Sequence, residues 1–238
     1  MRVLAGTSGF SYKEWKGSFY PEDLAAEDML RYYAQRLPAV EINNTFYRMP
    51  KPALLESWAG EVPEEFRFVL KASQRITHHK RLKDAAEEVA YFFRVAATLG
   101  ERLGPALFQL PPNLKKDLPR LVDFLGLLPA AARAAFEFRH ASWFEEDVFE
   151  ALRARGAALC IAEDEELSTP LVVTADWGYL RLRRQDYGDA DVAAWAQRIR
   201  AQVWSEAYVF FKHEDAGAGP KLAKQLLELL GSPAGSWG

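Results

Sequence analysis

The sequence predicts a (β/α)8 barrel of the TIM type, and three observations support this fold class. Eight short runs rich in Val, Ile, Leu and Phe recur along the chain, and amphipathic helical patterns lie between most of them. The length of 238 residues is close to the roughly 250 residues usual for this architecture. No linker, low-complexity tract or composition shift divides the chain, so we expect one domain over residues 1–238. An open doubly wound sheet is the alternative.

The strands are expected where the apolar runs lie, and the helices between them. The eight runs occupy residues 3–6, 39–43, 66–72, 106–110, 135–139, 158–162, 179–183 and 207–212. Apolar residues three or four apart, such as Val89, Phe92 and Phe93, predict the intervening helices. Asp84, Asp117, and Asp189 or Asp191 stand where N-capping residues of the third, fourth and seventh helices are expected.

The sixth unit is the exception to this alternation. Residues 163–178 show no helical period and contain Pro170. We therefore expect an irregular or missing sixth helix, replaced by a hairpin-like excursion through residues 171–174.

Composition and charge indicate the surroundings of the protein. The formal net charge of -3 and the sequence pI of about 5.9 give no global basic field for nucleic acid or an anionic membrane. The single cysteine, Cys160, cannot form a disulfide within the chain and fits a reducing compartment. The first six residues do not resemble a signal peptide, and no apolar run approaches the ~20 residues of a membrane span. We expect a cytoplasmic protein; the sequence does not indicate its oligomeric state.

Polar residues interrupt the predicted strands, mostly in their C-terminal halves. In a barrel both faces of a strand are covered, so these residues must point inward, toward the end where barrel enzymes keep their active sites. The expected inward set is Glu41, Asn43, Lys71, Gln109, Glu137, Arg139, Glu163, Arg181, Arg183 and Lys212. Buried charges must pair with one another or with a ligand, and the set carries a positive surplus. An ion-pair network that only stabilises the barrel is the competing interpretation.

Three loops at the same end add candidates. The first, residues 7–21, is aromatic, and its Tyr12 and Trp15 could either form the wall of a pocket or plug the barrel mouth. The third, residues 71–83, carries five Lys or Arg and two His, which suits a phosphate-bearing ligand or a solvated basic loop. After the last strand, His213 precedes a glycine-rich turn into a helix, a common setting for anions.

Several motifs resemble the YecE-like family, known as domain of unknown function 72. They cover nearly the whole chain and lie at residues 6–12 with Trp15 and Gly17, and at 19–21, 40–50, 76–79, 109–112, 137–140 with Ser142 and Trp143, and 179–183. The resemblance implies a (β/α)8 barrel. The family has no settled catalytic activity, so the resemblance transfers no catalytic residue.

The favoured hypothesis is an enzyme that binds a small phosphorylated or otherwise anionic substrate, such as a nucleotide or sugar phosphate, at the C-terminal end of the barrel. Glu137, Glu41 and His140 are the candidate catalytic groups. The candidate binding residues are Asn43, Lys71, Gln109, Arg139, Trp143, Arg181, Arg183, Lys212, His213, Tyr12 and Trp15.

Other functions remain open on the sequence. A glycosidase would use paired carboxylates among Glu41, Glu137 and Glu163. A metal-dependent phosphodiesterase or endonuclease-like hydrolase would use a divalent ion on Glu137, Glu163, Asp164 or His213, although no cofactor is firmly indicated. Nucleic acid is not indicated by net charge, but the basic third loop could contact a phosphate backbone. A non-catalytic binding or regulatory barrel is the last alternative.

Overall fold

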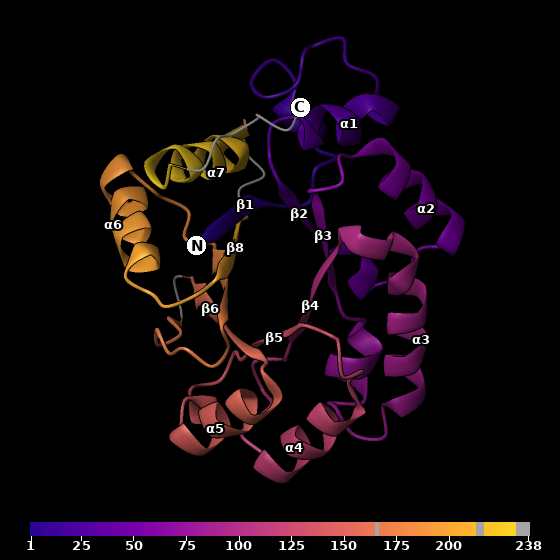
Figure 1. Ribbon diagram of the computed structural model, residues 1–238, viewed down its shortest axis with the longest axis vertical. Helices are drawn as coiled ribbons and strands as arrows, with labels where there is room; N and C mark the ends of the chain where they lie inside the picture. The colour runs from indigo at the N-terminus through magenta and orange to yellow at the C-terminus, as the bar shows by residue number, and fades with distance from the viewer. Residues whose placement is uncertain (165–166, 213–216, 232–238) are drawn as a thin grey trace.

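Eight parallel strands close into a barrel in chain order, which confirms the predicted fold class. The computed structural model describes residues 1–164, 167–212 and 217–231, and in it the helices surround the strands (Figure 1). The strands are β1 (Arg2–Ser8), β2 (Ala39–Ile42), β3 (Arg67–Lys71), β4 (Leu103–Gln109), β5 (Ala134–Glu137), β6 (Ala158–Glu163), β7 (Trp177–Leu182) and β8 (Glu206–Phe211). Parallel pairing of β1 with β8 completes the ring.

The α-helices alternate with the strands along most of the chain. They are α1 (Met29–Ala34), α2 (Pro52–Glu61), α3 (Ala86–Ala96), α4 (Leu118–Leu127), α5 (Glu146–Arg155), α6 (Asp189–Arg200) and α7 (Ala218–Leu229). The Asp117 side chain caps α4 by accepting a hydrogen bond from the Arg120 N–H. The expectation for Asp84 is wrong, because α3 begins after Ala85 without a side-chain cap. At α6 the Asp191 carboxylate accepts from the Gly188 N–H at 2.9 Å.

The described part of the segment between β6 and β7 contains no helix, as the sequence predicts. Ser168 forms an isolated antiparallel bridge to Glu163 near the C-terminal end of β6. Thr174 accepts a hydrogen bond from the Leu159 N–H and donates one to the Ala157 carbonyl at the other end of that strand. The segment therefore runs back along β6 in extended form and takes the place of a helix.

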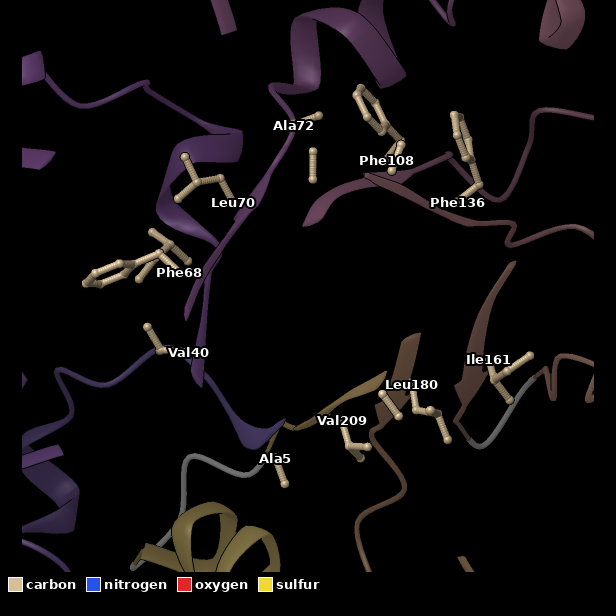
Figure 2. Close-up of a cluster of buried hydrophobic side chains, with 14 of the residues drawn as sticks. Ala5, Val40, Phe68, Leu70, Ala72, Phe108, Phe136, Ile161, Leu180 and Val209 are labelled. Carbon is tan, nitrogen blue, oxygen red and sulfur yellow. The ribbon is translucent and has the colours of Figure 1, made fainter. Parts of the chain in front are cut away.

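The two faces of the strands differ in chemistry. Figure 2 shows that Val40, Phe68, Phe108 and Phe136 point away from the centre of the barrel, toward the helices, where they join the main hydrophobic core. The side chains that alternate with the outward set belong to a second buried cluster that fills the interior, and it includes Leu4, Val69, Leu107, Tyr208 and Phe210. Burial on both faces explains why the strands read as nearly continuous apolar runs.

The interior changes from apolar to charged toward the C-terminal ends of the strands. Glu41, Lys71, Gln109, Glu137 and Arg181 are all buried there. No helix in the described residues has the length and apolarity needed to cross a bilayer.

Candidate anion-binding site at the barrel mouth

Two glutamates lie inside the mouth of the barrel, and both are completely buried. Glu41, from β2, accepts hydrogen bonds from the Ser8 hydroxyl at 2.7 Å and the Tyr179 hydroxyl at 2.5 Å. Glu137, the last residue of β5, accepts from Gln109 Nε2 at 2.9 Å. Because an unsolvated carboxylate costs several kcal/mol, these bonds and the ion pairs around them are what make the buried charges tolerable.

Arg181 of β7 joins the two glutamates. Its Nη2 lies 2.8 Å from Glu41 Oε1, and its Nη1 lies 2.5 Å from Glu137 Oε2. Burial alone would raise the pKa of Glu137, but the charges of Arg181 and Arg183 outweigh burial and lower it to about 2. Burial also opposes ionisation of Glu41, yet Arg181, Tyr179 and Ser8 together lower its pKa. The group is therefore a carboxylate–guanidinium–carboxylate cluster at neutral pH.

Lys71, the last residue of β3, lies beside this cluster without a carboxylate of its own. Its Nζ donates to Gln109 Oε1 at 2.8 Å and lies 4.2 Å from the centre of the Phe46 ring. Among the described residues no acidic oxygen comes within ion-pair distance of this ammonium group. Burial and then repulsion from Arg181 lower the pKa of Lys71 to about 8, although Glu137 and Glu41 pull in the opposite direction.

His78 lies in the same positive region. Its Nδ1 shares a hydrogen bond of 2.9 Å with the Thr77 hydroxyl. Burial lowers the pKa of His78, and the charges of Lys71 and Arg139 lower it further. His78 therefore lies within electrostatic reach of both Lys71, at the end of β3, and Arg139, which follows β5.

Arg183 and Arg139 line a small cavity of about 30 Å³ just beyond the ends of β5 and β7. Arg183 Nη2 is bound to Glu137 at 2.8 Å and to Asp164 at 3.0 Å. Its Nε is buried and has no hydrogen-bond partner among the described residues, and the same holds for the Thr169 hydroxyl, which belongs to the same lining. No hydrogen bond or ion pair to a described residue engages the Arg139 guanidinium. The cavity has room for little more than a water molecule, and its lining includes polar groups that a ligand oxygen reaching it could satisfy.

Several predicted site residues lie elsewhere. Trp15 and Trp143 are completely buried, and neither lines the cavity beside Arg139 and Arg183. Trp15 packs in an aromatic cluster with Tyr12, Phe19 and Tyr20, which belongs to the core between the strands and the helices. Trp143 donates to the Leu114 carbonyl at 2.7 Å and stacks on Phe138.

Other predicted residues are not fully buried but lie away from the cluster of Glu41, Glu137 and Arg181. The His140 ring accepts from the Ser142 N–H and serves as the cap of a short 3-10 turn. Tyr12 and Asn43 line a different cavity of about 550 Å³ beside α1 and α2. Lys212 is exposed, and His213 lies outside the described residues.

Glu163 corrects the expected inward set. The interior positions of β6 are Ala158, Cys160 and Ala162, so the next residue turns outward. The Glu163 carboxylate accepts from the Tyr187 hydroxyl at 2.6 Å and from Trp195 Nε1 at 2.9 Å, on the helix side of the barrel.

The sequence did not single out Ser8 and Tyr179, both of which bind Glu41. Strand alternation was the available signal for Tyr179, because it lies two residues before Arg181 and so shares its face. The glycine-rich turn before α7 is also less open than expected. A Cβ at Gly217 would meet the Ser18 hydroxyl at 2.6 Å, since the first loop covers this position.

Within residues 1–164, 167–212 and 217–231, no three His, Cys, Asp or Glu side chains come together in a way that would hold a metal ion. The proposed metal ligand His213 falls outside this part of the chain. Glu163 and Glu137, two other proposed ligands, point to opposite sides of the barrel wall.

Comparison with known families and structures agrees with the fold and the motifs. A family model described as "Protein of unknown function DUF72" matches residues 4–236. This chain belongs to the DUF72 family. The UPF0759 protein YunF of Bacillus subtilis (strain 168) is 26% identical over 255 residues, which cover 90% of each chain. The UPF0759 protein YecE of Escherichia coli (strain K12) is 32% identical over 128 residues, or 53% of this chain and 47% of that protein.

Two solved DUF72 structures extend the comparison. The one from Thermotoga maritima has a TM-score of 0.80 at 26% identity and covers 97% of this chain and 100% of its own. The one from Enterococcus faecalis V583 also has a TM-score of 0.80, at 20% identity, and covers 96% of this chain and 95% of its own. The latter supports the fold alone. The resemblance to the YecE-like family is confirmed, and none of these names assigns a reaction.

Proposed function

We propose that this DUF72 barrel binds a small ligand carrying a phosphate or carboxylate group at the C-terminal end of the strands. In this proposal Arg139 and Arg183 hold the anionic group, and Lys71 lies beside the rest of the ligand. The observation that carries the proposal is the pair of unpartnered buried polar atoms, Arg183 Nε and the Thr169 hydroxyl, which line one cavity with Arg139.

The charge balance supports an anion. Four cationic side chains, Lys71, Arg139, Arg181 and Arg183, meet three carboxylates, Glu41, Glu137 and Asp164. Both buried glutamates are already bound by arginine, so the positive excess falls at Lys71 and Arg139. Guanidinium groups bind phosphate and carboxylate in planar, often bidentate geometry, which gives strong and directional contacts.

The glutamates have a different role in this proposal from the one their residue type suggests. A general base works best with a pKa near the operating pH, whereas the pKa of Glu137 is about 2 and every near neighbour favours its ionised form. We therefore assign Glu137 and Glu41 to orienting Arg181 and Arg183. This leaves Lys71, with a pKa of about 8, as the group suited to chemistry at neutral pH.

The test is anion binding measured by titration calorimetry and thermal shift. Inorganic phosphate, acetate and a sugar phosphate are titrated into the native chain, into Arg139→Gln, and into Arg198→Gln as a matched control on the exposed face of α6. We expect the native chain to bind these anions. Arg139→Gln should weaken the affinity more than about tenfold, because at least one charged hydrogen bond is lost, and Arg198→Gln should leave the affinity unchanged. Absence of binding to the native chain, or equal binding to all three proteins, would refute the anion site.

A further inference from the structure

Lys71 is placed as a reactive amine. It ends β3 on the inward face, retains 9% of its surface exposed, and lies within electrostatic reach of Arg181 and Arg183. The charged and polar groups near it come from the neighbouring elements. They are Glu41 from β2, His78 after β3, Gln109 from β4, Glu137 from β5, and Arg181 and Arg183 at the end of β7, while Arg139 lies near His78. Each carboxylate in this set is bound by an arginine, and none pairs with the amine.

The hydrogen bond between Gln109 and Lys71 has a fixed direction. Glu137 is ionised and can only accept, so Gln109 must turn its amide nitrogen toward Glu137 and its carbonyl oxygen toward Lys71. The Lys71 nitrogen therefore donates to Gln109 whether it is charged or neutral. In the neutral amine this contact uses an N–H and leaves the lone pair unengaged by Gln109, which is the requirement for a nucleophile.

Burial and the charge of Arg181 raise the fraction of Lys71 in the neutral form. With a pKa of about 8 for Lys71, a substantial fraction of molecules carry the free amine near pH 7.5. At the same pH a lysine with the ordinary pKa is neutral in only about one molecule in a thousand. A desolvated lysine beside another cation is a recognised arrangement for attack on carbonyl groups.

We propose that Lys71 is a nucleophile that forms an imine with a small carbonyl compound whose carboxylate or phosphate is held by Arg139 and Arg183. The inference rests on the anion site proposed above and names its ligand class, a 2-oxo acid or a keto or aldehyde phosphate. The amine nitrogen attacks the carbonyl carbon, a C–N bond forms, and the carbonyl oxygen takes up a proton. The carbinolamine oxygen takes up a second proton and leaves as water as its C–O bond breaks, and the nitrogen releases its two protons to solvent. The protons balance, and no oxidant or reductant is required.

The experiment traps the imine and locates it. The native chain is incubated with glyoxylate, or with dihydroxyacetone phosphate, in the presence of sodium cyanoborohydride, digested and mapped by mass spectrometry. We expect the reduced adduct on Lys71 to exceed that on Lys83, an exposed lysine of the same loop, by more than about tenfold, since its free-amine fraction is larger. The yield of the Lys71 adduct should rise with pH, and the midpoint of that rise should lie near the Lys71 pKa of about 8. The mapping uses the native protein, so it does not depend on a variant folding.

Controls separate this inference from the anion site. Arg139→Gln should reduce the Lys71 adduct with glyoxylate more than about tenfold while leaving Lys83 unchanged, and Lys71→Arg should abolish it at that position. If phosphate binds the native chain normally but adducts spread over exposed lysines, the imine inference is overturned and the anion site stands. If Lys71 reacts as fast with neutral acetaldehyde as with glyoxylate, and Arg139→Gln has no effect, the assigned ligand class is wrong.

Discussion

Two groups of charged side chains lie at the same end of this barrel, and they differ in how their charge is neutralised. Around β7, Arg181 is fully enclosed and bound to two glutamates. Across the mouth, Lys71 and Arg139 carry the same sign of charge without a carboxylate bonded to either among the described residues. We infer from this difference that the first group stabilises the fold, and we propose that the second binds a ligand. The predictions below test this division, beginning with the largest effect.

Replacing Arg181 by Met should destabilise the protein most. It leaves Glu41 and Glu137 buried without their main counter-charge, and breaking such a pair costs about 3–5 kcal/mol of unfolding free energy. Urea denaturation monitored by circular dichroism measures it. Arg139→Met is the matched control and should change stability by less than about 1 kcal/mol. Equal losses of unfolding free energy in the two variants would contradict the distinction between the two groups.

The second-largest effect should be the loss of unfolding free energy in acid, where Glu137 becomes protonated. The folded pKa of Glu137, about 2, lies below its ordinary value of 4.5, so its stabilisation is present above pH 4.5 and is lost as pH falls toward 2. From pH 5 to pH 3 this one group should remove about 2 kcal/mol of unfolding free energy. Urea midpoints at the two pH values, compared with those of Glu137→Gln, measure its share. An identical pH dependence in the variant would contradict the assignment.

Lys71→Met should change the unfolding free energy less, and any change should be stabilising. The folded pKa of Lys71 is lowered, so the protonated amine is a cost to the fold at neutral pH, present in full below pH 8 and relieved as pH rises toward 10.5. The variant removes that cost but leaves the Gln109 carbonyl without its donor. We expect stability near pH 7 to stay constant or rise by about 1 kcal/mol. Thermal unfolding measures it, and a loss above about 1 kcal/mol would mean that Lys71 belongs to the stabilising group.

Lys212→Ala should have the smallest effect. Lys212 follows β8 and is exposed, so its removal should change unfolding free energy by no more than about 0.5 kcal/mol. It should also leave phosphate affinity within about twofold, because screened surface charges contribute little at physiological salt. A larger loss of affinity would extend the anion site across the mouth to β8.

The sequence predicted the barrel because its signals are local. Apolar runs, helical spacing and the missing period before β7 each depend on a few consecutive residues, and inward placement of Glu137 follows from strand alternation. Glu163 shows the limit of that reasoning. Its polar character near the end of its strand predicts an inward position, whereas counting along the strand from Cys160 places it outward.

The pairing within the site could not be read from the sequence. Glu41 and Arg181 are separated by 140 positions and meet only because of barrel closure and strand register. Burial of loop aromatics is likewise a tertiary property, so Trp15 and Trp143 could not be distinguished from exposed binding residues. The same limit applies to Arg183 Nε and the Thr169 hydroxyl, whose lack of partners depends on the packing of three separate segments.

Gln109 also has a consequence for how this family can diverge. Its amide presents a donor to one neighbour and an acceptor to the other, and no other neutral side chain of that length does both. A glutamate there would oppose Glu137, and a leucine would leave both partners unsatisfied. Positions 71, 109 and 137 should therefore change together or not at all during evolution, and a relative that has lost the lysine should also have lost the glutamine.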